Sequence, residues 1–154
     1  MARLASALYS VAIAVWVGGM LAIGFIAAPV LFTQFADRTM AGNLAGEMFT
    51  ITAWMGLGCG AYLTLFILFA NGWRAFRSGV FWIVLLMLVL TAAGYFGVQP
   101  ILAQLKADAL PRQVMESALR DRFATWHGVS SGLYLVQCLL GIALVILQDR
   151  GRGR

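Results

Sequence analysis

Four stretches without a charged side chain divide the sequence, and they constrain its fold more than any other feature. No Asp, Glu, Lys or Arg occurs between Arg3 and Asp37, between Glu47 and Arg74, between Arg77 and Lys106, or between Arg122 and Asp149. Each stretch is longer than the roughly 20 residues that a helix needs to cross about 30 Å of hydrocarbon. We therefore predict an all-α membrane protein, a four-transmembrane-helix bundle with spans near residues 5–32, 48–72, 79–101 and 124–148.

The composition excludes a soluble globular protein. Hydrophobic residues make up 62% of the 154 positions and charged residues 11%, with a mean hydropathy of +0.87. A chain of this size cannot bury that much apolar surface in its own core. A transmembrane barrel would show short alternating segments, whereas these apolar runs are continuous. No linker or repeat interrupts the chain, so we expect a single membrane domain over residues 1–154.

Basic residues lie in short patches at the ends of the apolar runs, and they predict the orientation. The net charge is +5. One side of the membrane would collect Arg3, Arg74, Arg77, Arg150, Arg152 and Arg154, and the other Arg38, Lys106, Arg112, Arg120 and Arg122. The count is six cations against five, and the tight Arg74/Arg77 turn and the Arg-rich tail, both close to span ends, favour cytoplasmic termini for a multi-pass protein of the bacterial inner membrane. The expected partners are the lipid bilayer and another membrane protein or a second copy, and nucleic acid is not among them.

The segments between the spans carry weaker signals. Residues 102–123 contain Pro111, followed by apolar residues at helical spacing, namely Val114, Met115, Ala118, Leu119 and Phe123. This pattern predicts an amphipathic external segment before the fourth helix. We also expect a bend near Gly128, a kink at Pro29, and a continuation of the first helix into residues 33–47.

Small residues mark the places where helices are expected to pack closely. The candidates are Gly18, Gly19, Gly56, Gly60, Gly128 and Gly132. Small residues four positions apart let two helix backbones approach one another in lipid. We expect packing within the chain at Gly56/Gly60 and at Gly128/Gly132, and the alternative is a face that pairs with a second copy.

One polar stripe follows the fourth span. His127, Ser131, Tyr134 and Cys138 recur at helical spacing, and Tyr95 and Gln99 lie at a similar depth in the third span. Polar groups within a span usually face the bundle interior or a wet cavity. We therefore predict a polar pocket built from Tyr95, Gln99, His127 and Ser131. His127, the one histidine, is either an interfacial hydrogen-bonded side chain or a cofactor ligand.

Sulfur-containing residues form a second candidate site near the middle of the membrane. They are Cys59, Cys138, Met20, Met55 and Met87. Thiol and thioether groups are soft ligands that suit Cu(I), but Met and free Cys are also ordinary core residues, and a disulfide is a third alternative. A single histidine cannot supply both axial ligands of haem b within one chain. No nucleophile–base pair, paired carboxylates or zinc spacing occurs, so we predict no catalytic residue and no cofactor, with haem or copper as alternatives.

Several short motifs resemble those of a known family. They are Trp16-Val17-Gly18-Gly19, Ala28-Pro29-Val30-Leu31-Phe32, Ala41-Gly42, Gly46-x-x-Phe49 and Phe123-x-x-x-His127-Gly128-x-Ser130. With these motifs the chain resembles the bacterial domain-of-unknown-function family 4149, which is similar to the eukaryotic transmembrane protein 205. The resemblance implies a small four-span inner-membrane protein.

A more distant similarity extends to copper-resistance-D proteins and to four-helix protoporphyrinogen oxidases. Those oxidases carry a histidine upstream of the Trp-x-x-Gly motif, where this chain has Tyr9 and Ser10. Three functions follow as alternatives. The first is a non-catalytic scaffold or accessory subunit that works through helix–helix contacts. The second is a haem- or copper-binding redox or resistance protein, and the third is a transporter of small molecules or lipids.

Overall fold

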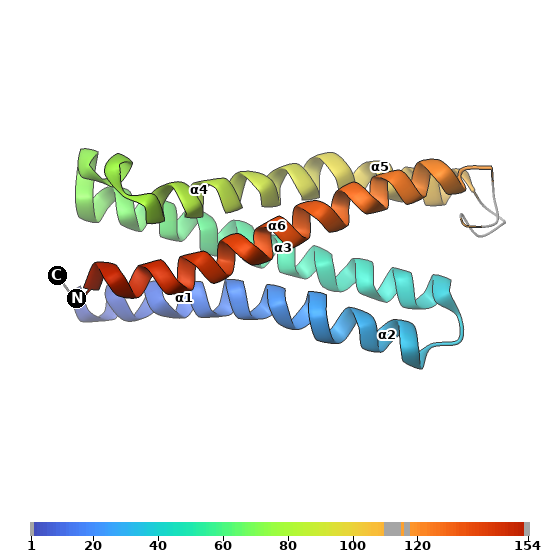
Figure 1. The fold of residues 1–154 in the computed structure, drawn as a ribbon, viewed down its shortest axis with the longest axis horizontal. Coiled ribbons are helices and arrows are strands. Elements are labelled where there is room, and N and C mark those ends of the chain that lie inside the picture. The colour runs from blue at the N-terminus through green and yellow to red at the C-terminus, as the bar shows by residue number, and fades with distance from the viewer. Residues whose placement is uncertain (1, 110–114, 116–117, 153–154) are drawn as a thin grey trace.

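The charge-free stretches form four helices that are long and apolar enough to cross a membrane, which confirms the predicted all-α four-helix bundle. The computed structural model describes residues 2–109, 115 and 118–152. The four helical spans are Leu4–Gln34, Arg38–Arg77, Gly79–Asp108 and Arg120–Gln148 (Figure 1). The part of the chain that is described contains no strand.

The first and third spans each change their helical winding just before a proline. The first consists of α1 (Ala2–Ala22), the π-helical η1 (Ile23–Ala27) and α2 (Ala28–Gln34), and the third of α4 (Gly79–Ala92), the π-helical η3 (Ala93–Val98) and α5 (Gln99–Asp108). Pro29 and Pro100 lie in the first turns of α2 and α5. Proline has no N–H to donate, and a π-helical turn absorbs the resulting break. The irregularity expected at Pro29 therefore takes the form of η1.

The second span begins well before residue 48. Its helix α3 runs over Arg38–Asn71, because the Asp37 carboxylate caps the first turn by accepting hydrogen bonds from the backbone N–H groups of Thr39 (2.8 Å) and Met40 (3.3 Å). At its other end Gly72 has φ +52°, a left-handed conformation that suits glycine. This residue starts the 3-10 turn η2 (Gly72–Arg77), which leads into α4. The first span ends at Gln34, so it continues over only two residues of the 33–47 segment and not through it as expected.

The fourth span is one unbroken helix, α6 (Arg120–Arg152), so the bend expected near Gly128 does not occur. Glycine alone does not interrupt a helix whose backbone hydrogen bonds are all made. The predicted amphipathic segment over 102–123 is covered by α5 up to Asp108, and Pro111 and Val114 lie outside the described residues.

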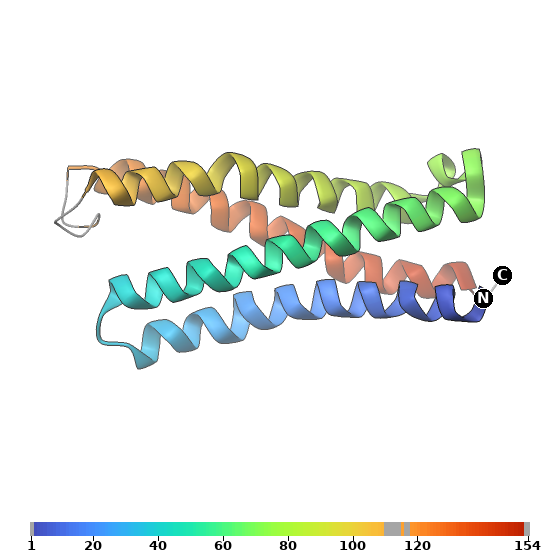
Figure 2. The same cartoon turned by 180° about the vertical axis from the view of Figure 1, so that it is seen from behind.

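Both termini and η2 lie at one end of the bundle, which we call the terminal end (Figure 1). We call the opposite end the loop end. Helices α3 and α6 cross near the middle of the molecule (Figures 1 and 2). At the loop end α3 lies beside α2 and α6 beside α5, whereas at the terminal end α3 packs on α4 and α6 on α1. The two helix pairs at the loop end thus separate from one another.

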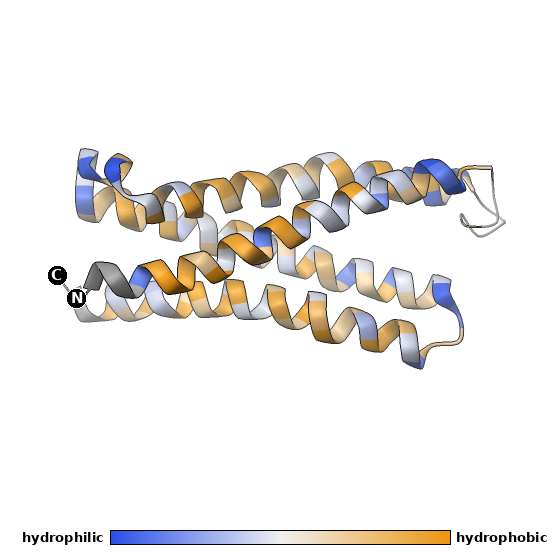
Figure 3. Ribbon diagram, viewed as in Figure 1, coloured by the Kyte–Doolittle hydropathy of each residue, from blue (hydrophilic) through white to orange (hydrophobic). Residues whose placement is uncertain are grey.

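The apolar core lies in the middle of the bundle and in its terminal half. Its largest fully buried side chains include Trp16, Met20, Leu63, Met87 and Leu144, which come from all four spans. Hydrophobic residues make up most of each span, and hydrophilic residues lie mainly toward the helix ends (Figure 3). The candidate site lies at the loop end, where the two helix pairs separate.

Candidate functional site

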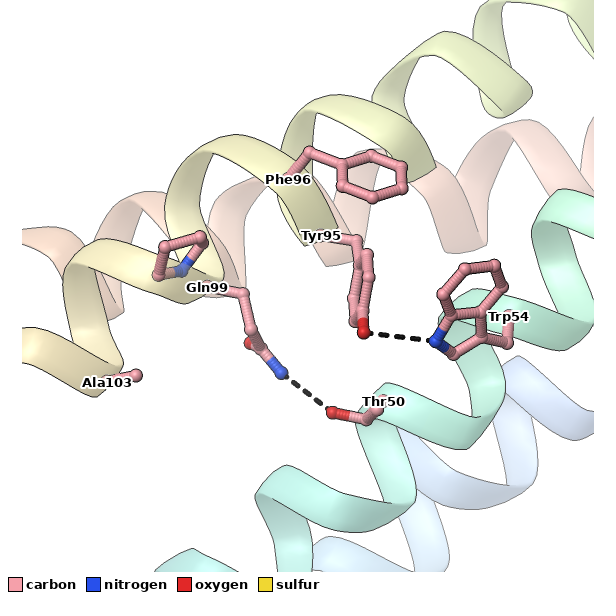
Figure 4. Close-up of a pocket in the computed structure, with 7 residues that line it drawn as sticks. Thr50, Trp54, Tyr95, Phe96, Gln99 and Ala103 are labelled. Atoms are coloured by element: carbon pink, nitrogen blue, oxygen red, sulfur yellow. Dashed lines mark hydrogen bonds between the residues drawn. The ribbon is translucent and has the colours of Figure 1, made fainter.

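A pocket of about 420 Å³ lies between α3 and the third span, toward the loop end (Figure 4). Its lining residues are Thr50, Trp54, Tyr95, Phe96, Gln99, Pro100 and Ala103. The π-helical η3 and the proline that follows it supply most of one wall. The pocket is open to the surroundings of the bundle, because its lining residues Trp54 and Phe96 are 56% and 61% exposed.

Hydrogen bonds between side chains join the two walls of this pocket. The Gln99 amide donates to the Thr50 hydroxyl over 3.0 Å, and the Trp54 indole N–H donates to the Tyr95 hydroxyl over 3.0 Å (Figure 4). The Trp54 and Tyr95 rings also meet edge to face, with centroids 5.4 Å apart. These bonds connect helices that belong to different pairs at the loop end.

A third bond continues the same register toward the loop end. The Lys106 ammonium donates to the Asn43 side-chain oxygen over 3.3 Å. Seven residues separate Asn43 from Thr50 on α3, and the same number separates Lys106 from Gln99 on α5. The two contacts are therefore separated by the same two turns, about 10 Å along the axis, on both of the antiparallel helices. We call the three pairs the polar ladder.

The polar groups of the pocket retain unused hydrogen-bonding capacity. The Tyr95 hydroxyl accepts from Trp54, and its own proton has no acceptor among the described residues. The Gln99 amide donates through its nitrogen, while its carbonyl oxygen accepts nothing from the described part of the chain. A bound molecule could therefore both accept from Tyr95 and donate to Gln99.

His127 and Ser131 do not belong to the pocket that Tyr95 and Gln99 line. Both are exposed on α6. The His127 ring stacks on Phe123 with centroids 5.9 Å apart, and the Ser131 hydroxyl donates to the His127 backbone carbonyl. The two residues are exposed because, at the loop end, α6 lies beside α5 and away from the first span.

Deeper residues of the same stripe are covered. The Tyr134 hydroxyl donates to the Met20 backbone carbonyl over 2.5 Å, and its ring meets the edge of Phe49. Cys138, one turn further, is 1% exposed. The predicted stripe is therefore a single helix face that passes from exposed to buried.

The sulfur residues divide between the core and the periphery. Met20, Met87 and Cys138 belong to one buried cluster, whereas Cys59 is half-buried and lines a shallow groove beside Tyr62 and Leu8. Met55 packs its terminal methyl group over Gly19, where an added Cβ would lie 2.6 Å away. Both cysteines are free. Among the described residues, no three His, Cys, Asp or Glu side chains come together as metal ligands.

Of the two glycine pairs, Gly56/Gly60 packs against a side chain of the same molecule. A Cβ at Gly56 would lie 2.6 Å from Nε1 of Trp16, and one at Gly60 would lie 2.9 Å from the far edge of the same indole. The ring of Trp16, which is 1% exposed, therefore covers both glycines.

Gly128/Gly132 is open. Both residues are exposed, and a Cβ at either position would meet no described residue within 4 Å. The internal packing that the sequence favoured at this pair is therefore absent, because the outer face of α6 points away from the bundle. Gly18 is open in the same way.

Sequence reasoning missed one buried polar contact. Gln137 is 7% exposed, and its amide donates to the Thr91 hydroxyl over 3.0 Å and to the Met87 carbonyl over 3.3 Å. Thr91 in turn donates to the Met87 carbonyl over 2.8 Å. The signal was present, because a glutamine in the middle of an apolar span is costly unless it finds a partner.

Comparison with known proteins gives one match. A family model described as Domain of unknown function (DUF4149) matches residues 11–111, which is more than half of the chain. No curated protein and no solved structure matches. The matched residues include Trp16, the Gly56/Gly60 pair and all three rungs of the polar ladder.

Proposed function

Because the chain belongs to the DUF4149 family, whose description names no activity, we propose its function from the structure: it is a scaffold or accessory subunit of the membrane that works through helix–helix contacts. The observation that carries this proposal is the contrast between the two glycine pairs. One is covered by Trp16, and the other lies open on the outward face of α6.

Open glycines need an explanation because glycine disfavours a helix. Each costs about 0.5–1 kcal/mol relative to alanine, and in lipid the compensation is the close approach of another backbone. Gly128 and Gly132 gain no such contact within the described chain. Other open glycines, such as Gly58, have no second open glycine four positions away on the same helix.

The outward face of α6 fits a second copy of the same chain. Beyond Gly132 it continues with Leu135, Leu139 and Ile142 at intervals of three and four residues, and all three are exposed. A second copy inserted in the same orientation presents this face in parallel, so that a two-fold axis along the membrane normal brings the glycines of both copies together. The pairing would position two bundles side by side.

Two differently tagged copies expressed together test this proposal. The wild-type copies should purify together from mild detergent, and replacement of both Gly128 and Gly132 by leucine should abolish the association. Gly58→Leu is the matched control, because Gly58 is also exposed on a span with nothing near its Cβ position. Failure of the wild-type copies to associate, or equal association of the leucine variant, overturns the proposal.

We also assign the orientation from the flanking charges. Arg74 and Arg77 are exposed in η2 at the terminal end, where both termini lie (Figure 1). From the positive-inside rule we infer that the terminal end lies in the cytoplasm and the loop end outside, in the inner membrane of a bacterium. A reporter fused at the C-terminus should be active only if it functions in the cytoplasm, and periplasmic activity would reverse the assignment.

Copper binding is the second candidate, favoured by one observation. Met20, Met87 and Cys138 share a buried cluster, and these are ligand types that Cu(I) prefers. Purified protein should then carry copper that is lost in Cys138→Ala, and metal-free protein that gains no stability from Cu(I) would remove this candidate. The haem alternative rests on His127 alone, and its test is a reduced-minus-oxidised visible spectrum.

A further inference from the structure

On its loop-end side, the pocket is bordered by one acidic and one basic residue, Glu47 and Lys106, and we call this border the rim. Glu47 lies between Asn43 and Thr50 on the same stripe of α3, because these residues are spaced by four and three positions. Ala103 lines the pocket, and Lys106 follows three residues later on the same side of α5. An exposed carboxylate and a half-buried ammonium therefore face the same rim from opposite helices.

Neither charge is neutralised within the described chain. No ion pair joins Glu47 or Lys106 to a described residue, and Lys106 bonds only the uncharged Asn43. An ammonium has three donors, so two remain for a ligand. Asp108, two residues beyond Lys106, does not share its helix face.

The layers of the site match the layers of a lipid leaflet. Lys106 lies two residues before the end of α5, and Glu47 lies on α3 about one turn deeper than the Lys106–Asn43 pair, so both are at the height expected for headgroups. Gln99 lies about 10 Å below Lys106 along the helix, within reach of an ester group of the same lipid, and Tyr95 lies about 16 Å below it, at the height of the acyl chains. The exposed rings of Trp54 and Phe96 form an apolar surface at the height of the acyl chains (Figure 4).

We propose that this pocket binds one zwitterionic phospholipid whose headgroup carries a primary ammonium. Lys106 binds the phosphate, Glu47 accepts from the ammonium, and the second N–H of the Gln99 amide donates to an ester carbonyl. The acyl chain lies against Trp54 and Phe96. A net anionic lipid fits less well, because Glu47 would face it without a counter-charge.

Native mass spectrometry of the full-length protein tests the assignment. The protein is released from detergent after mixing with equal amounts of phosphatidylethanolamine, phosphatidylcholine and phosphatidylglycerol. We expect one phosphatidylethanolamine to be retained in preference to both others. Lys106→Ala and Glu47→Gln should each lower that retention roughly fivefold to tenfold, since each removes a charge-assisted hydrogen bond.

Two controls separate this site from general lipid adhesion. Arg122→Ala removes an exposed cation at the same end of the molecule and should leave retention unchanged. Free phosphoethanolamine should not bind, because it lacks the chains that cover Trp54 and Phe96. Preference for phosphatidylglycerol, equal retention of all three lipids, retention unaffected by the two rim variants, or binding of the free headgroup overturns the proposal. Thermal unfolding of each variant checks that the fold is intact.

Discussion

The indole of Trp16 lies across Gly56 so closely that a methyl group at Gly56 would come within 2.6 Å of its Nε1 atom. Trp16 belongs to α1 and Gly56 to α3, so this contact fixes how the first two spans cross. Because Trp16 is 1% exposed and surrounded by core residues, the ring has no free space into which it could move.

Gly56→Ala should therefore destabilise the bundle. Overpacking of a filled core typically costs about 1–3 kcal/mol. The measurement is the free energy of unfolding in mixed detergent micelles. Gly58→Ala is the control and should be neutral or stabilising by about 0.5–1 kcal/mol, since its Cβ position is open and alanine favours a helix. Equal effects of the two substitutions would show that Trp16 does not fill the groove.

Replacement of Gln137 by leucine should destabilise the protein modestly. It removes the bonds to Thr91 and to the Met87 carbonyl, and hydrogen bonds between transmembrane helices average about 0.6 kcal/mol. Thr91 keeps its own bond to the Met87 carbonyl, so no buried hydroxyl is left without a partner. Gln104→Leu, at an exposed position of α5, should change the unfolding free energy less.

Tyr134→Phe tests the contribution of the hydroxyl to stability separately from that of the ring. The substitution removes the bond to the Met20 carbonyl but keeps the edge contact with Phe49. We expect a loss of about 0.5–1.5 kcal/mol in unfolding free energy. Tyr134→Ala should lose more, because it also removes the ring that covers Gly24. Identical losses for the two variants would contradict this division.

A double-mutant cycle tests the polar ladder. Thr50→Ala and Gln99→Ala should each weaken the loop end, and their combination should lose less than the sum, with a coupling of about 0.6 kcal/mol. Thr33 is exposed on α2 and bonds only its own helix, so Thr33→Ala combined with Gln99→Ala should be additive. Additivity of the Thr50 and Gln99 substitutions would show that this rung does not hold the helices together.

Much of the fold could be predicted because lipid imposes strong rules. The charge-free stretches predicted the four spans, and the stripe from His127 to Cys138 is a single helix face in the structure. The early start of α3 escaped prediction because the charge-free stretch begins only after Glu47, although Asp37 is a typical N-cap.

The candidate site could be predicted only in part. The depth of Tyr95, Gln99, His127 and Ser131 follows from residue counting, but the direction each faces depends on how the helices cross. Because α3 and α6 cross in the middle, the loop end separates into two pairs (Figures 1 and 2). His127 and Ser131 thereby become exposed, while Thr50 and Trp54 meet the third span instead.

The central claim is that the outward face of α6 pairs two copies of the chain, and energy transfer in lipid vesicles tests it most directly. Donor- and acceptor-labelled proteins are mixed at decreasing ratios of protein to lipid. Wild type and Gly58→Leu should show specific transfer that persists on dilution, and Gly132→Leu should show only the transfer of unassociated proteins. Equal transfer in Gly132→Leu and wild type, or no specific transfer in wild type, would contradict the claim.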